Sequence, residues 1–194
     1  MLRIEKGNPW VFFPQGICDM FPDNPGNLIL TGEHYFKFEL KFKIVEEINE
    51  QKTLFAIIPR YTGLDLHESK MVFTITCEDK VEHIDIPSVI QPFKEHFLRV
   101  VHKPGEGMYL YIDGMLMLNI NLTDHKLGLS EKPHIIFGAG NFPKNGFNLN
   151  YVDVELYEFS LYNESTLLSH HLFEEFIFNK SVDLTDNCNF LHKL

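Results

Sequence analysis

The sequence has little cysteine, little positive charge and no long apolar run. Its three cysteines, Cys18, Cys77 and Cys188, are far apart and form no CxxC pair, so neither a zinc site nor a disulfide framework is expected. Lys and Arg number 17 against 27 Asp and Glu, which gives a net charge of −10. Binding to nucleic acid or to an anionic membrane needs clustered cations, so the sequence disfavours both partners.

No segment approaches the roughly 20 consecutive apolar residues that a membrane-spanning helix needs. The N-terminus also lacks the apolar stretch of a secretory signal. We therefore expect neither a signal peptide nor a transmembrane segment. The protein would be cytoplasmic or virion-associated, or a domain excised from a larger protein.

What the sequence does contain is many short stretches of alternating apolar and polar residues. Over residues 35–44, apolar side chains alternate with lysine and glutamate, which is typical of a strand buried on one face. Similar alternating patterns occur over 71–77, 81–86, 97–102, 108–113, 115–122, 134–138 and 150–162, and residues 53–58 form a short apolar run that also predicts a strand. Turn residues separate them at a spacing typical of a sandwich. We expect an all-β, antiparallel two-sheet β-sandwich.

Two local features predict details of these sheets. Asp113 and Gly114 lie between two alternating segments, which predicts a two-residue type I′ hairpin turn because both of its central residues have positive φ. In the last strand the apolar phase changes between Leu156 and Phe159, which predicts a β-bulge near Tyr157.

The chain divides into one core region and two flanks. Residues 1–34 are rich in Gly, Pro and Asn, and we expect short extended pieces there along a sheet edge of the same domain. Residues 35–178 would form the sandwich and end in a short helix, since apolar residues recur at helical spacing over 165–178. Residues 179–194 would form a C-terminal tail.

Three of these segments carry recognisable motifs. Residues 96–101 combine an aromatic residue with alternating apolar ones, residues 108–114 form an apolar-Tyr-apolar-Asp-Gly hairpin, and residues 137–141 with 157–163 form a closing pair. Together they resemble the laminin-G-like, concanavalin A-like superfamily of lectins and glucanases over about residues 30–178. The resemblance implies a concanavalin A-like jelly roll. Its motifs specify fold rather than activity, so by analogy we interpret the chain as a non-catalytic, lectin-like recognition module for a glycan.

Carbohydrate binding needs aromatic rings and planar polar groups, and such residues collect on loops. The loops 60–68 and 141–148 supply the candidates. The predicted ligand-binding residues are Arg60, Tyr61, Asp65, Asn141, Phe142 and Asn145. Trp10 is a further candidate platform. We expect no cofactor. Calcium is the alternative, because the resemblance implies relatives that hold Ca²⁺ through Asp, Asn and backbone oxygens, and loop 141–148 offers such groups.

Two other functions stay open. The first is a structural or assembly role with a protein partner, as a virion component or an accessory domain of a larger carbohydrate-active protein. The second is a glycoside hydrolase that uses Asp153, Glu155 and Glu158, whose spacing is related to a retaining β-glucanase motif with the first two residue types exchanged. A hydrolase would need these carboxylates to converge and one of them to have a raised pKa.

Overall fold

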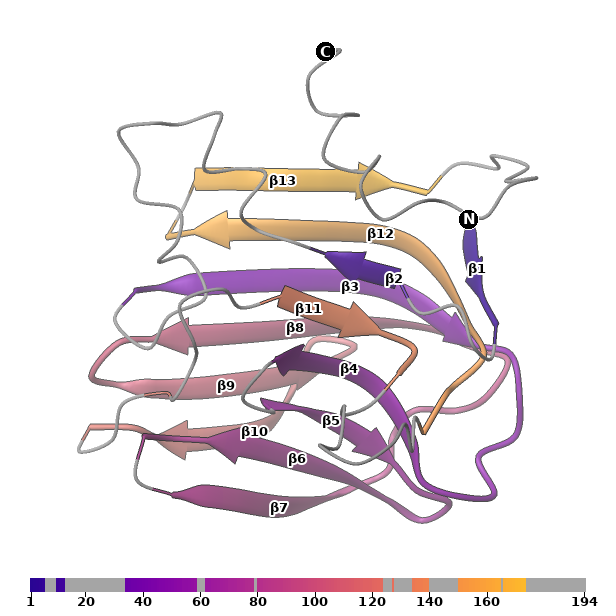
Figure 1. Ribbon diagram of the computed structural model, residues 1–194, viewed down its shortest axis with the longest axis horizontal. Coiled ribbons are helices and arrows are strands. Elements are labelled where there is room, and N and C mark those ends of the chain that lie inside the picture. Colours follow the sequence, from indigo (N-terminus) through magenta and orange to yellow (C-terminus); the bar gives the residue numbers. More distant parts are fainter. Residues whose placement is uncertain are drawn as a thin grey trace.

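The computed structural model describes residues 1–5, 10–12, 34–58, 62–78, 80–123, 127, 134–139, 150–164 and 166–173. These residues form two β-sheets that face each other, and every pair of neighbouring strands is antiparallel (Figure 1). No described residue is helical. The predicted antiparallel two-sheet β-sandwich is therefore confirmed.

The larger sheet has seven strands in the order β1-β12-β3-β8-β9-β10, with β13 also paired to β12. Its strands are β1 (Leu2–Ile4), β3 (Phe36–Ile44), β8 (Glu95–Lys103), β9 (Gly107–Ile112), β10 (Met115–Asn121), β12 (Val154–Asn163) and β13 (Thr166–Leu172). Strands far apart in the sequence lie side by side, as β3 does between β8 and β12 (Figure 1). Such long connections between neighbouring strands are typical of jelly-roll sandwiches.

The smaller sheet has six strands in the order β2-β11-β4-β5-β6-β7. Its strands are β2 (Trp10–Phe12), β4 (Lys52–Ile58), β5 (Thr62–Leu66), β6 (Lys70–Thr76), β7 (Val81–Pro87) and β11 (His134–Phe137). The two short N-terminal strands, β1 and β2, each pair at one side only, with β12 and β11 respectively. Within residues 1–34, the described parts that form strands are thus extended pieces along sheet edges.

Aromatic side chains fill the space between the sheets. The fully buried phenylalanines are Phe36, Phe38, Phe42, Phe55, Phe73, Phe137 and Phe159. Rings of the two sheets meet edge to face, for example Phe38 with Phe55 at 5.2 Å and Phe137 with Phe159 at 5.4 Å between centroids. Trp10 stacks on Phe137 at 5.3 Å. The structure therefore places Trp10 in the core packing, not on a surface loop.

The turn between β9 and β10 has the predicted geometry. Asp113 and Gly114 have φ angles of 51° and 81°, as a type I′ turn requires. The Asp113 carboxylate accepts the backbone N–H of Phe97 at 2.8 Å and the Nδ1–H of buried His96 at 2.7 Å. His96 Nε2 accepts the N–H of Gln91 at 2.9 Å, which leaves the ring proton on Nδ1. One aspartate thus fixes the turn and ties it to β8.

The predicted β-bulge is also present. The register between β12 and β3 shifts between Leu156 and Glu158, so Tyr157 is the extra residue. The shift lets Leu156 before the bulge and Phe159 after it both point into the core, where both are fully buried.

The predicted helix over 165–178 is wrong over its described part. Residues 166–172 form β13, which pairs antiparallel with the C-terminal half of β12. Helical spacing of a few leucines is a weak local signal, and pairing with the open edge of β12 satisfies the backbone instead. Leu167 and Leu172 remain half exposed, so the apolar stripe is not buried as a helix face would be. Residues 174–178 lie outside the described part of the chain.

The segment 60–68, predicted as a loop, contains a strand. Residues Thr62–Leu66 form β5 between β4 and β6. A Cβ atom on Gly63 would lie 2.4 Å from the backbone oxygen of Phe55, so glycine is needed for the strands to approach. Leu64 and Leu66 point into the core with the two-residue spacing of a strand. The glycine beside them made this alternation hard to recognise in the sequence.

Candidate functional site

Only one of the six predicted ligand-binding residues lies within the described part of the chain. Asp65 belongs to β5, not to a loop, and is only 7% exposed. Its carboxylate accepts hydrogen bonds from Thr53 Oγ1 at 2.6 Å and from Gln51 Nε2 at 3.1 Å. Asp65 therefore holds β4 and β5 together, and its prediction as an exposed loop residue is wrong.

The remaining predicted residues fall outside the described ranges. They are Arg60, Tyr61, Asn141, Phe142 and Asn145. The loop 141–148, the calcium candidate, falls outside them as well. Among the residues that the structure does describe, no three His, Cys, Asp or Glu side chains converge as metal ligands would. Nor does this part of the chain hold a helix long and apolar enough to cross a membrane.

The outer face of the smaller sheet is largely closed. Side chains alternate along a strand, so the residues next to core positions on β4, β5, β6 and β11 point outward. Several of these outward-pointing residues are nevertheless buried, with exposed fractions of 7% or less: Thr53, Ala56, Asp65, Thr74 and Ile136. Ala56 and Ile136 form a small apolar cluster separate from the main core. This central region of the face offers little surface to a ligand.

The outer face of the larger sheet is open. Along β3 buried and half-exposed residues alternate without a break. In the register of the sheet, outward Glu39 lies opposite Arg99 of β8, which lies opposite Tyr111 of β9. Next to this row, Lys37 lies opposite Val101, which lies opposite Tyr109. We call Lys37, Glu39, Arg99, Tyr109 and Tyr111 the arginine–tyrosine face.

Ion pairs and ring contacts hold the charged groups of this face. Arg99 Nε donates to Glu39 Oε1 at 2.7 Å, and Lys37 Nζ lies 3.4 Å from the same oxygen. Lys37 Nζ also lies 3.6 Å from the centre of the Tyr162 ring. Within the described residues, no ring or cation contact involves Tyr111, whose side chain is partly exposed. The face thus combines an available aromatic ring with oriented donors and an acceptor.

This face could have been found from the sequence. Its residues are the outward phase of strands 35–44, 97–102 and 108–113, all of which the alternation predicted. Loops were favoured because binding residues collect there. The signal that was passed over is two tyrosines, Tyr109 and Tyr111, on the polar phase of a strand, where solvent-exposed sheets carry mostly hydrophilic residues.

The carboxylates of the hydrolase alternative lie at one end of the same face. Burial raises the pKa of Glu155, but the hydrogen bonds from Lys43 and Tyr157 together lower it by more than burial raises it. The pKa of Glu155 therefore lies below its ordinary value. A general acid needs the opposite shift. The backbone N–H of Asp153 donates to Glu46 at 2.7 Å, and the Glu158 side chain is 43% exposed. The geometry does not prepare these groups for glycoside hydrolysis.

A serine and a histidine meet between β12 and β13. Ser160 Oγ lies 2.8 Å from His170 Nδ1, and Glu158 Oε1 lies 3.8 Å from the same nitrogen. In a catalytic triad the serine and the acid contact different ring nitrogens, so that the base can pass a proton between them. Because both groups approach Nδ1, this cluster lacks the arrangement of a hydrolase triad.

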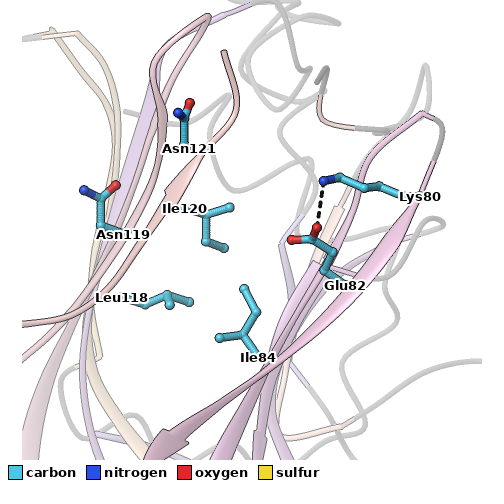
Figure 2. A pocket seen from close by; sticks show the side chains of 7 residues that line it. All are labelled: Lys80, Glu82, Ile84, Leu118, Asn119, Ile120 and Asn121. Atoms are coloured by element: carbon cyan, nitrogen blue, oxygen red, sulfur yellow. Dashed lines mark hydrogen bonds and ion pairs between the residues drawn. The ribbon is translucent and has the colours of Figure 1, made fainter. Parts of the chain in front are cut away.

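A groove opens between the two sheets where β7 faces β10 (Figure 2). It has a volume of about 460 Å³ and is lined by Lys80, Glu82, Ile84, Leu118, Asn119, Ile120 and Asn121. Ile84, Leu118 and Ile120 point toward one another across it, while Lys80 and Glu82 form an ion pair of 2.7 Å at its rim (Figure 2). Among the described residues, no aromatic ring lines it, and this part of the chain gives it no stacking platform of the kind that sugar recognition uses.

Comparisons with known proteins bear on the fold. Neither a protein-family model nor a curated protein matches this sequence. Among solved structures, the chain is similar to the CBM40 domain of an IT-sialidase of Ruminococcus gnavus bound to α2,3-sialyllactose, with a TM-score of 0.52 and 12% identity over 80% of this chain and 88% of that one. It is also similar to sheep galectin-11 in complex with glycerol, with a TM-score of 0.50 and 8% identity over 81% of this chain and 100% of that one.

A third similar structure is the binding domain of botulinum neurotoxin serotype D, with a TM-score of 0.50 and 15% identity over 70% of this chain. The chain spans about a third, 34%, of the length of that domain. At these identities the likeness concerns the fold alone. The chain has the fold of the lectin-type β-sandwich domains.

Proposed function

We propose that the protein is a non-catalytic, lectin-like recognition module that binds a glycan on the arginine–tyrosine face. The observation that carries this proposal is the pairing of partly exposed tyrosine side chains with fixed charged groups on an open sheet. Tyrosine rings stack on the apolar faces of sugar rings, and Arg99, Lys37 and Glu39 supply donors and an acceptor for sugar hydroxyls. The central outer face of the smaller sheet, in contrast, is buried.

The similar structures are consistent with this proposal. Two of them are named as a carbohydrate-binding domain with a bound sialyllactose and as a galectin. One fold hosts many functions, so the proposal rests on the surface residues of this chain and not on the likeness. We further propose that the chain belongs to the laminin-G-like, concanavalin A-like superfamily that three of its segments resemble.

Substitution of the predicted loop residues tests whether they contribute to the same binding. Arg60, Tyr61, Asn141, Phe142 and Asn145 remain predicted ligand contacts. If they contribute, Tyr61→Ala and Asn141→Ala weaken the binding of an identified glycan. We propose that binding needs no metal ion, so that affinity is the same with calcium and with a chelator.

The experiment is a glycan-array screen of the purified protein with and without calcium, followed by titration of the strongest hit. We expect a specific hit that is unaffected by calcium. Tyr111→Ser removes the ring and should weaken binding at least about tenfold, which corresponds to about 1.4 kcal/mol. The matched control is His83→Ser, which removes an exposed ring from the smaller sheet and should leave affinity unchanged. An empty array would refute the proposal.

The second candidate is an assembly role with a protein partner. Large apolar side chains are exposed at two places on the larger sheet: Met115 and Leu116 at the start of β10, and Leu167 and Leu172 on β13. Exposed apolar groups of this kind favour protein contacts. Light scattering that finds a defined oligomer, together with an empty glycan array, would favour this role over the lectin.

A further inference from the structure

Arg99 is held in place from one side only. Its Nε donates to Glu39 at 2.7 Å, and its guanidinium carbon lies 5.7 Å from the centre of the Phe97 ring. Within the described residues, no side chain or carbonyl accepts a hydrogen bond from its two Nη groups. The guanidinium is therefore oriented along one edge, and the edge formed by the two Nη groups is available to a ligand.

Arg99 and Lys37 share a single carboxylate, although the chain as a whole is acidic. The arginine–tyrosine face holds two cations, Lys37 and Arg99, and one carboxylate, Glu39, which both cations contact. The full chain has a net charge of −10. A local excess of positive charge on an acidic protein favours an anionic ligand at that place.

The neighbours of Arg99 indicate what kind of anion this is. Tyr111 lies directly opposite Arg99 in the register, and Tyr109 lies one row away. A guanidinium edge matches a planar carboxylate with two parallel hydrogen bonds. A tyrosine ring beside it stacks on the sugar ring to which a carboxylate can be attached.

We infer that the arginine–tyrosine face is selective for a carboxylate-bearing sugar, with Arg99 pairing with the carboxylate and Tyr111 stacking on the ring; the inference rests on the proposed function. Glu39 acts as a positioning residue because it fixes the guanidinium through Nε. Lys37 contributes long-range attraction, since Glu39 and the Tyr162 ring already engage its ammonium group.

Matched saccharides test the carboxylate directly. The probes are 3′-sialyllactose and tetragalacturonic acid, each compared with its own methyl ester, which keeps the sugar but removes the negative charge. Titration calorimetry should show that at least one free acid binds, and that its ester binds at least about tenfold more weakly, as loss of a charged hydrogen-bonded pair implies. Raising the salt concentration should weaken binding of the acid more than of the ester.

Three variants assign the effect to Arg99. Arg99→Gln removes the guanidinium and should weaken binding of the acid at least about tenfold while leaving the ester unchanged. Glu39→Gln keeps an acceptor for Nε but removes the competing negative charge, so it should strengthen binding of the acid. The control Arg3→Gln removes the same charge from an exposed side chain of β1, at the edge of the same sheet, and should change neither affinity.

The outcomes separate this inference from the proposed function. If array hits are neutral glycans that bind Arg99→Gln as tightly as the unmodified protein, the inference is overturned and the lectin function stands. Equal affinity for each acid and its ester would likewise overturn the inference and leave the lectin function standing. If no saccharide binds in any assay, the lectin function itself fails and the inference fails with it.

Discussion

The two sheets differ in what their outer faces do. The larger sheet presents an open outer face on which charged groups and tyrosines alternate with core residues, as along β3. The smaller sheet buries its outer face at the centre, where all described side chains of β4 from Lys52 to Ile57 are buried. Strands buried on both faces read as continuous apolar runs, whereas strands buried on one face alternate. The contrast teaches that only the alternating strands leave side chains available for a ligand.

The largest expected effect comes from placing the same charge on each outer face. Ile136→Asp on the smaller sheet puts a carboxylate at a position that is 1% exposed, and should lower the free energy of unfolding by more than about 3 kcal/mol. Tyr111→Asp on the open face should lower it by about 1 kcal/mol or less. Urea denaturation measures both. Similar losses for the two variants would mean that the outer faces do not differ as described.

The next effect concerns the turn that supports the tyrosine-bearing strand β9. Asp113→Ala leaves the His96 Nδ1–H unpaired at a site that is 2% exposed and puts alanine at a φ of 51°. We expect a loss of about 3 kcal/mol in the free energy of unfolding. In Asp113→Asn the new asparagine tolerates this φ and keeps one hydrogen-bond acceptor, so the loss of unfolding free energy should be smaller. A melting temperature unchanged in Asp113→Ala would contradict the structural role of the aspartate.

The smallest effect is a dependence of stability on pH. Burial lowers the pKa of His102 below its ordinary value near 6.5, and the hydrogen bond from Nδ1 to the His34 carbonyl only partly opposes this. Below pH 6.5 this histidine becomes protonated in the unfolded chain but stays neutral in the folded chain. Stability is therefore complete above pH 6.5 and falls as the pH falls toward the lower folded-state pKa.

Thermal melts across this pH range test the assignment to His102. Burial also lowers the pKa of His171, and the nearby His170 adds to the effect, so part of the pH dependence should persist without His102. His102→Asn keeps an N–H donor but does not titrate, and its melting temperature should fall less on acidification. An unchanged pH dependence in this variant would contradict the role of His102.

Local patterns predicted most of the sandwich. Alternation and one short apolar run located nine strands, and the phase change at Tyr157 predicted a bulge that the structure contains. The two elements described wrongly, the strand Thr62–Leu66 and the strand Thr166–Leu172, are ones in which tertiary contacts decide the conformation. Gly63 hides a strand because its role is a close approach to Phe55. The leucines near residue 167 belong to a hairpin with the preceding strand β12, and their helical spacing concealed this pairing.

The site was less predictable than the fold. Residue type suggested Asp65 as a ligand, but the register with Thr53 makes it a buried hydrogen-bond acceptor. Tyr111 and Arg99 were visible as outward residues of predicted strands, yet only the pairing of β8 with β9 brings them opposite each other. In a hairpin the turn sets the register, so the position of Tyr111 opposite Arg99 follows from the turn at residues 104–106, which the alternation of the strands alone does not predict.

The most direct test of the central claim is to map where a glycan binds. Two-dimensional NMR of the ¹⁵N-labelled protein, titrated with the strongest array hit, reports which backbone amides shift. We predict that the shifts concentrate on Arg99, Tyr109 and Tyr111 and their neighbours on the larger sheet. Shifts confined to the smaller sheet, or to the groove between β7 and β10, would contradict the assignment of the glycan to the arginine–tyrosine face.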